Sequence, residues 1–208
     1  MTGHPEGNPI VFVVDDDANV RGGLRDLLAS IGLRSAVFSS TAEFLQSKPF
    51  DGAGCLILDV RLPGLGGLDF QAELTAAKIN IPIIFITGHG DIPMSVRALK
   101  AGAVEFLTKP FRDQDILDAV KIALERDRAR RNSDGKTRDL RLQFEALSPR
   151  EKRVMALVTA GLMNKQIAAE IGVSEVTVKV HRHNVVKKLG ARSLADLVRM
   201  ADALGVSR

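Results

Sequence analysis

Several polar side chains in the first half of the chain are placed where they could do chemistry together. Three consecutive carboxylates, Asp15 to Asp17, follow the apolar run IVFVV, and Asp59 follows CLIL. Thr87 follows IIFI, and Lys109 follows EFLT. Carboxylates packed together raise one another's pKa unless a cation compensates, and Mg²⁺ is the usual cation held by oxygen ligands. The residue types therefore predict a site that holds a hard cation such as Mg²⁺.

Such a site requires strands whose carboxyl ends meet at one edge of a sheet. Short apolar runs alternate with amphipathic segments, a pattern that predicts a doubly wound α/β domain with a five-stranded parallel sheet. In that architecture ligands bind beyond the carboxyl ends of the strands. One Asp or Thr at a strand end is most simply a helix cap, but four strands that end this way favour a shared site. The expected strands are Ile10–Val14, Ser35–Phe38, Cys55–Leu58, Ile83–Ile86 and Glu105–Leu107.

Four motifs link this half of the chain to a known family. VVDDD, LILDVRLPG, FITGHGD and FLTKPF, in this order and each after its own strand, resemble the receiver domains of two-component response regulators. The resemblance covers roughly residues 8–125 and implies a flavodoxin-like fold. It implies that Asp59 is the phosphoacceptor and that the donor is a sensor histidine kinase. The protein ligands of Mg²⁺ would be Asp15, Asp16, Asp59 and the backbone carbonyl of Arg61.

The same resemblance assigns further residues around the phosphoacceptor. Thr87 would bond one phosphoryl oxygen, and Lys109 would pair with another. Phe106, three residues before the lysine, would be the aromatic side chain that rotates inward when Thr87 moves, although burial in the core is its simplest role. The bond from Lys109 to Pro110 is expected to be cis. Asp17 has no role in the family and is expected only to cap the first helix.

The second half of the chain predicts a different fold. Ser148, Pro149 and Glu151 have the spacing of a capping box with a first-turn proline, so a helix begins there and ends near Gly161. A short helix, 165–171, is stopped by Gly172, and a third helix runs from the cap Ser174 to Leu189. Two helices joined by a short turn that contains glycine form a helix-turn-helix. We expect an all-α domain of four helices.

The third helix of this part carries cations and exposed valines on one face, which suits a DNA major groove. LSPREKRVM, AGLMNKQIA and VTVKVHRHNVVKKL resemble the LuxR type of DNA-binding domain over residues 145–205. By this resemblance the residues that face bases are Lys179, Val180 and His183. The residues near phosphates would be Lys165, Thr177, Arg182, Lys187 and Lys188.

Charge separates the two halves. Residues 1–125 hold 11 Lys and Arg against 16 Asp and Glu, whereas residues 148–208 hold 11 against 5. An acidic front and a basic back favour a nucleic-acid partner for the second half alone. A single cysteine and the lack of any apolar run long enough for a membrane span indicate a cytoplasmic protein without a membrane partner. We expect a receiver domain over 1–125, a helical linker over 126–144 and a DNA-binding domain over 145–208.

Within the linker the sequence NSDG, residues 132–135, predicts a break in the helix, with a second helical piece from Thr137 to Ala146. The arginines before it are most simply a solvated face and only second a phosphate contact.

Together the two resemblances indicate a response regulator of the FixJ/NarL family, which is not an enzyme. Phosphorylation would promote a homodimer that binds double-stranded promoter DNA and activates transcription, with RNA polymerase as a further partner. One rival is a haloacid-dehalogenase-like phosphatase, since Asp15 and Asp17 have the spacing of that family's acidic pair; it leaves Asp59 and the basic domain unexplained. Another is a ligand-sensing quorum regulator with the same output domain, but the chain has no Trp or Tyr for its aromatic pocket.

Overall fold

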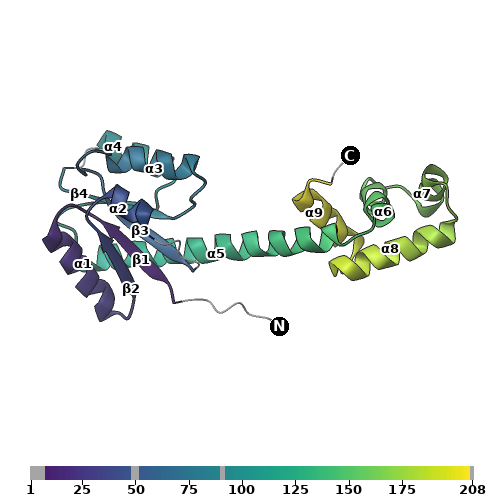
Figure 1. Ribbon diagram of the computed structural model, residues 1–208, viewed down its shortest axis with the longest axis horizontal. Coiled ribbons are helices and arrows are strands. Elements are labelled where there is room, and N and C mark those ends of the chain that lie inside the picture. The colour runs from purple at the N-terminus through teal and green to yellow at the C-terminus, as the bar shows by residue number, and fades with distance from the viewer. Residues whose placement is uncertain (1–7, 48–51, 90–91, 207–208) are drawn as a thin grey trace. The chain divides into compact units, whose positions relative to one another are not determined.

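A computed structural model describes residues 8–47, 52–89 and 92–206, and it divides the chain into two compact units (Figure 1). The first unit ends at Arg131 and the second begins at Asn132. Gly90 and Asp91 of the FITGHGD motif lie outside the described residues. Among the helices that are described, none is both long and apolar enough to cross a membrane.

The first unit is built on a sheet of five parallel strands in the order β2-β1-β3-β4-β5. This confirms the predicted fold class, and each strand lies within two residues of its predicted bounds. β3 and β4 are buried along their whole length, as strands covered on both faces must be. The strands are β1 (Ile10–Val14), β2 (Arg34–Phe38), β3 (Gly54–Asp59), β4 (Ile83–Thr87) and β5 (Glu105–Thr108).

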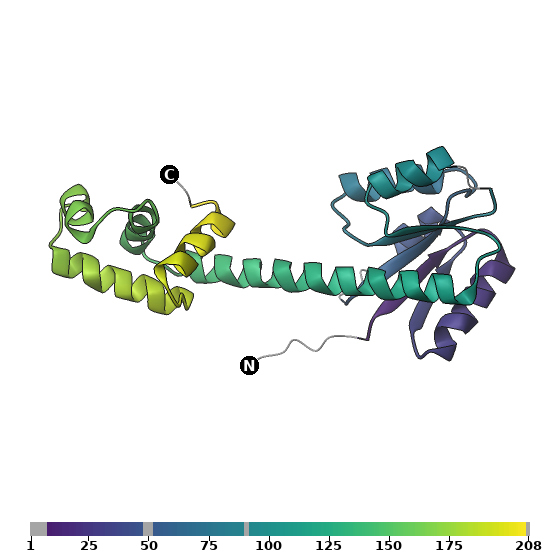
Figure 2. The same ribbon diagram turned by 180° about the vertical axis from the view of Figure 1, so that it is seen from behind.

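Helices cover both faces of the sheet (Figures 1 and 2). Alternate side chains of each strand point to opposite faces, so the sheet divides the apolar core in two. On one face the core joins the sheet to α1 and α5, through side chains such as Leu28 and Val120. On the other face it joins the sheet to α2, α3 and α4, through side chains such as Phe44 and Phe70. The helices are α1 (Ala18–Ser30), α2 (Thr41–Gln46), α3 (Gly67–Ala76), α4 (Ile92–Lys100) and α5 (Asp113–Glu145).

The predicted break in the linker is wrong, because α5 is helical through residues 132–135. Asn, Ser, Asp and Gly are weak helix formers, but extending a formed helix costs far less than starting a new one. Both flanks of this segment are held by packing. Before it, the buried Asp127 accepts a hydrogen bond of 3.0 Å from the amide of Gly54. After it, Leu140 and Phe144 pack against the core of the second unit.

The second unit is helical throughout its regular structure. α6 (Pro149–Thr159), α7 (Asn164–Ile171), α8 (Glu175–Leu189) and α9 (Leu194–Leu204) surround one apolar core. α7 ends at Gly172, whose φ of +68° is a left-handed conformation that glycine adopts without strain. The chain then turns and begins α8 at the cap Ser174, whose hydroxyl accepts from the amide of Thr177. The predicted helix-turn-helix is therefore present.

A buried carboxylate joins the first and third helices of this unit. Glu151 closes the capping box with Ser148 at the start of α6, and its Oε2 also accepts a hydrogen bond of 2.7 Å from Nζ of Lys188 on α8. These bonds lower the pKa of Glu151 to about 2 from its ordinary value of 4.5, the bond from Lys188 contributing most. The ionised carboxylate is thus favoured by folding.

We predict that Glu151→Gln destabilises the second unit in a pH-dependent way. Gln still serves in a capping box but cannot pair with an ammonium, so unfolding free energy at neutral pH should fall by about 1 to 3 kcal/mol. Because the folded-state pKa is depressed, the contribution of Glu151 is complete above pH 4.5 and is lost as the pH falls toward 2. The difference between variant and wild type should shrink over that window.

Urea unfolding followed by the methyl NMR signal of the buried Met155 measures this unit alone. Glu145→Gln is the matched control, since Glu145 forms an exposed pair with Lys152 and should change the free energy of unfolding by less than about 0.5 kcal/mol. Equal effects of the two variants, or no pH dependence, would contradict the role given to Glu151.

Candidate functional site

The strand register brings the predicted chemical residues of the first unit to one edge of the sheet. Val14 pairs with Leu58, so Asp15 and Asp59 follow directly from neighbouring positions of β1 and β3. Thr87 at the end of β4 pairs with Thr108 of β5, and Lys109 comes next. All four strands run in the same direction, so their carboxyl ends meet at this rim.

Three carboxylates gather there. Asp15, Asp16 and Asp59 each offer one carboxylate oxygen to a common site, and these three oxygens lie within 4.8 Å of one another. Asp15 and Asp59 are buried, whereas Asp16 is exposed. An all-oxygen set that is open to water on one side suits Mg²⁺, which usually keeps several waters when a protein binds it. The residues present therefore fit the predicted cation.

Lys109 supplies positive charge at the same place. Its Nζ donates to Oδ2 of Asp15 at 2.6 Å and to Oδ2 of Asp59 at 2.7 Å. Partial burial disfavours the ammonium, but the two carboxylates outweigh that effect and raise the pKa of Lys109. Burial raises the pKa of Asp15, although Lys109 opposes the shift. The lysine thus bridges the two buried acids and balances part of their charge.

Short-range hydrogen bonds hold the acidic loops in shape. Oδ1 of Asp15 accepts from the amide of Asp17, and Oδ1 of Asp59 accepts from the amide of Arg61, each at 2.9 Å. The guanidinium of Arg21 donates to the backbone carbonyl of Asp15 at 2.7 Å. Asp17 caps α1 by accepting from the amide of Asn19, which confirms its expected role. The three consecutive carboxylates therefore divide between the cluster and a helix cap.

Gly67 is a residue whose importance sequence reasoning missed. It begins α3, and its amide donates to the carbonyl of Val60 at 2.9 Å. A Cβ added at this position would lie 2.5 Å from the backbone carbonyl oxygen of Asp59, so no larger residue fits without moving the backbone. The available signal was the pair Gly66 and Gly67, one residue after LILDVRLPG.

The two predicted switch residues lie on β4 and β5. Thr87 is fully buried, and its Oγ1 accepts from the amide of His89 at 3.3 Å. Phe106 is partly buried, with its ring centroid 6.3 Å from that of Phe85. The expected cis bond between Lys109 and Pro110 is present. Arg61 is exposed two residues after Asp59.

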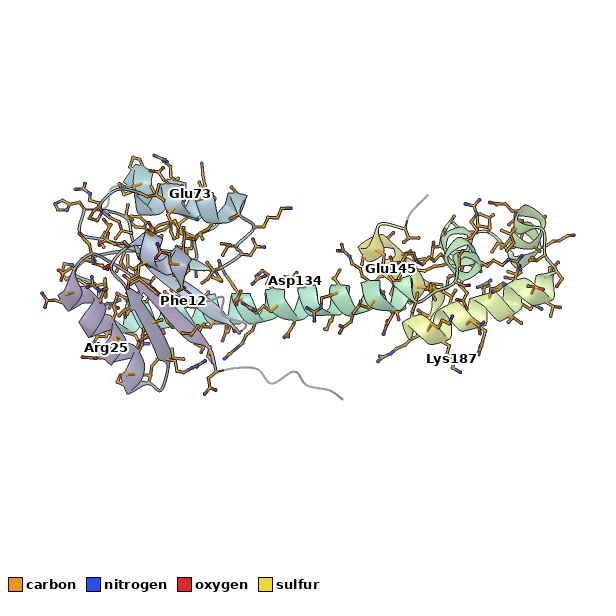
Figure 3. The ribbon with its side chains drawn as sticks, viewed as in Figure 1. Phe12, Arg25, Glu73, Asp134, Glu145 and Lys187 are labelled. Carbon is orange, nitrogen blue, oxygen red and sulfur yellow. The ribbon has the colours of Figure 1, made fainter. Side chains whose placement is uncertain are left out.

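In the second unit, α8 presents most of the predicted DNA-contacting side chains to solvent. Lys179, Val180, His183 and Lys187 are exposed on this helix, and Lys165 is exposed on α7. Figure 3 shows the side chain of Lys187 extending from α8. Exposed cations beside an exposed valine are suited to a surface that meets phosphates and base edges.

The remaining predicted DNA contacts also make bonds within the unit. Nη1 of Arg182 donates to Oδ1 of Asn164 at 2.6 Å and ties α8 to the start of α7. Lys188 is bonded to Glu151, and the Thr177 hydroxyl lies 2.9 Å from that of Ser174. Sequence reasoning missed these bonds because the partners lie on other helices or in the cap.

Comparison with known families assigns both units. Residues 11–121 match the response regulator receiver domain, and residues 145–201 match the luxR family of bacterial regulatory proteins. The DNA-binding match begins at the residue where the predicted domain begins, and the receiver match lies inside the predicted receiver.

Individual relatives match nearly the whole chain. Nodulation protein W of Bradyrhizobium diazoefficiens is 59% identical over 207 residues, which cover 99% of this chain and 91% of that protein. Transcriptional regulatory protein FixJ of Rhizobium meliloti is 44% identical over 195 residues, covering 94% and 96%. The solved structure of response regulator StyR has a TM-score of 0.82 at 51% identity, covering 94% of this chain and 99% of that one.

The full-length FixJ structure from B. japonicum has a TM-score of 0.57 at 39% identity, covering 96% and 98%. These relatives extend over both units, and the sheet and helices of the first unit have the geometry of the receiver fold. The chain therefore belongs to the two-component response regulators that join a receiver domain to a LuxR-type DNA-binding domain.

Proposed function

We propose that a sensor histidine kinase phosphorylates this regulator on Asp59, and that the phosphorylated form dimerises and binds promoter DNA. The observation that carries the proposal is the buried Asp59 carboxylate, which lies in the carboxylate cluster and receives a hydrogen bond from Lys109. We assign the receiver to residues 1–125, the linker to 126–144 and the DNA-binding domain to 145–208. Packing of Asp127 and Phe144 extends each folded unit into the linker helix.

In the reaction, an oxygen of Asp59 attacks phosphorus in line while the bond from phosphorus to the kinase histidine breaks. Asp15, Asp16, Asp59 and the backbone carbonyl of Arg61 would hold Mg²⁺, and the ion would supply positive charge to the phosphoryl oxygens. Lys109 pairs with another of these oxygens, and this contact replaces its bond to Asp59. The product is an acyl phosphate, which hydrolyses and makes the signal temporary.

Phosphorylation changes the surface of α4 and β5 through Thr87 and Phe106. The hydroxyl of Thr87 moves to bond the phosphoryl group, and the ring of Phe106 turns into the space that it leaves. Phe has no phenolic oxygen, so the two positions of this ring differ in packing and not in an outer hydrogen bond. Packed interiors favour discrete arrangements over gradual ones, which suits a two-state signal.

The proposed place of action is the cytoplasm, where the promoter and RNA polymerase are found. The regulator activates transcription by contacting the polymerase while it is bound to DNA. Its receiver is phosphorylated once per signal and does not turn over an external substrate.

We predict that acetyl phosphate with Mg²⁺ labels the wild type with one phosphoryl group per chain and leaves Asp59→Asn unlabelled. Asp17→Asn is the matched control, because that carboxylate stands beside the cluster but caps α1, and this variant should still be labelled. Removing Mg²⁺ with a chelator should abolish labelling, since the acidic cluster then repels the incoming anion. Intact mass spectrometry measures the added phosphoryl group.

Labelling that persists in Asp59→Asn would place the acceptor elsewhere. Continuous hydrolysis of p-nitrophenyl phosphate that depends on Asp15 and Asp17, without stoichiometric labelling, would instead support the phosphatase alternative.

Phosphorylation should convert monomers to dimers through α4 and β5. α4 exposes a row of apolar side chains, Ile92, Val96 and Leu99, at 80%, 41% and 45% of their surface. An exposed apolar row beside the switch residues is suited to pairing with a second copy. Sedimentation of the chain with beryllofluoride, a phosphoryl analogue, should show twice the mass, and Val96→Asp should prevent the change without reducing labelling of Asp59. The same mass with and without the analogue would refute dimerisation.

Two lysines of α8 should differ in their effect on DNA binding. Lys187→Ala removes a phosphate contact, so affinity for cognate and random duplexes should fall alike and the slope of log K against log salt should fall by about one. Lys179→Ala should cost about 1 to 3 kcal/mol on the cognate duplex and little on random DNA, because it reads a base edge. Competition binding against both duplexes measures the difference; equal losses for Lys179→Ala would refute base contact.

Lys188→Ala is unsuitable for this test, since it also removes the partner of the buried Glu151.

A further inference from the structure

Val176 is the most exposed of the large apolar side chains on α8, and nothing in the fold of the second unit explains its place. It is 69% exposed at the second position of the helix, and Val180, one turn later, is 53% exposed. The inward side of α8 is filled by other residues, Val178, Val185 and Leu189. A β-branched side chain that is mostly exposed lowers helix propensity slightly and gains little burial.

A single exposed valine is ordinary on a protein surface. The neighbours of Val176 make this one different. At about 100° per residue, Val176, Val180, His183 and Lys187 project within about 60° of one another and form one ridge along α8. Lys179 lies beside this ridge, and all of these side chains are exposed. A ridge that mixes methyl groups with basic side chains matches a polyanion that also offers apolar groups.

The DNA major groove is such a partner. Its floor presents hydrogen-bonding groups and one apolar group, the C5 methyl of thymine. The N-terminal residues of a recognition helix are the ones that approach the base edges in a helix-turn-helix complex. Val176 is at that end of α8, directly after the cap Ser174 and Glu175.

We infer that Val176 reads the C5 methyl of a thymine in each half-site, and that Val180 reads a second thymine methyl about two base pairs away. The spacing follows from geometry: four residues of helix rise about 6 Å, and base pairs rise about 3.4 Å each. This inference rests on the proposed insertion of α8 into the major groove, and it adds a sequence requirement that Lys179 and His183 do not supply.

The test uses the full chain treated with acetyl phosphate and Mg²⁺, and a cognate duplex selected from random sequences by repeated binding. Each thymine of the half-site is replaced in turn by deoxyuridine, which removes only the C5 methyl group. Competition binding then gives the change in Kd for wild type, Val176→Ala, Val180→Ala and a control. The control is Val186→Ala, because Val186 is on the same helix but lines a small apolar cavity with Leu194 and Leu197 of α9.

At one thymine, deoxyuridine should weaken wild-type binding about fourfold, the loss expected for one buried methyl group. Val176→Ala should bind the thymine duplex about fourfold more weakly and show no further loss with deoxyuridine at that position. Val180→Ala should behave in the same way at a thymine about two base pairs away. Val186→Ala should retain the full fourfold sensitivity at both positions.

If deoxyuridine weakens binding by Val176→Ala as much as binding by the wild type at every sensitive position, the Val176 side chain touches no thymine methyl and the inference is overturned. The same holds if no position is sensitive to deoxyuridine. In both cases the proposed binding of DNA by α8 still stands if Lys179→Ala loses affinity for the selected duplex. A chain that selects no sequence at all would overturn the proposed DNA binding, and the role of Val176 with it.

Discussion

The ion pairs between Lys109 and the two buried carboxylates Asp15 and Asp59 are the interactions on which the receiver depends. Removing a carboxylate from water costs several kcal/mol unless a partner charge and hydrogen bonds compensate. Here the compensation comes from a lysine that follows β5, the edge strand, while the acids lie at the carboxyl ends of β1 and β3 in the middle of the sheet. The strand order and register must therefore be correct before the acids can be buried. The ion pairs form only in the correctly paired sheet, and they stabilise that pairing in turn.

The DNA-binding unit also buries a carboxylate, but it compensates the charge in a different way. Glu151 is also a buried carboxylate bonded to one lysine, but the oxygen that accepts from Lys188, Oε2, also accepts from the backbone amide of Ser148. Among the described residues Glu151 belongs to no acidic group that could hold a metal ion, whereas the receiver cluster includes the exposed Asp16. One arrangement is closed and structural, and the other leaves an acidic face open to a cation and a phosphoryl group. The two sites use the same residue types, and they differ in whether solvent can reach the carboxylates.

The sequence predicted what depends on local pattern. Five strands, the helix-turn-helix and the cap role of Asp17 all follow from residues that are close together in the chain, and the acidic cluster follows from strand ends that a parallel sheet brings to one edge. Features that depend on distant partners were missed. The bond from Gly54 to Asp127 spans 73 positions, and that from Lys188 to Glu151 spans 37. The break predicted at residues 132–135 failed for the same reason, because packing of Asp127, Leu140 and Phe144 holds the helix on both sides.

β3 is attached at both ends, and this limits which changes of length the receiver can tolerate. At its start the amide of Gly54 is bonded to Asp127, and at its end Asp59 is bonded to Lys109. The six residues of β3, which include Gly54 and Asp59, are all buried. Inserting or deleting one residue here would exchange the two faces of the strand and break one attachment or the other. Natural variation in length among such chains should therefore fall in the loops around β3 and spare the strand itself.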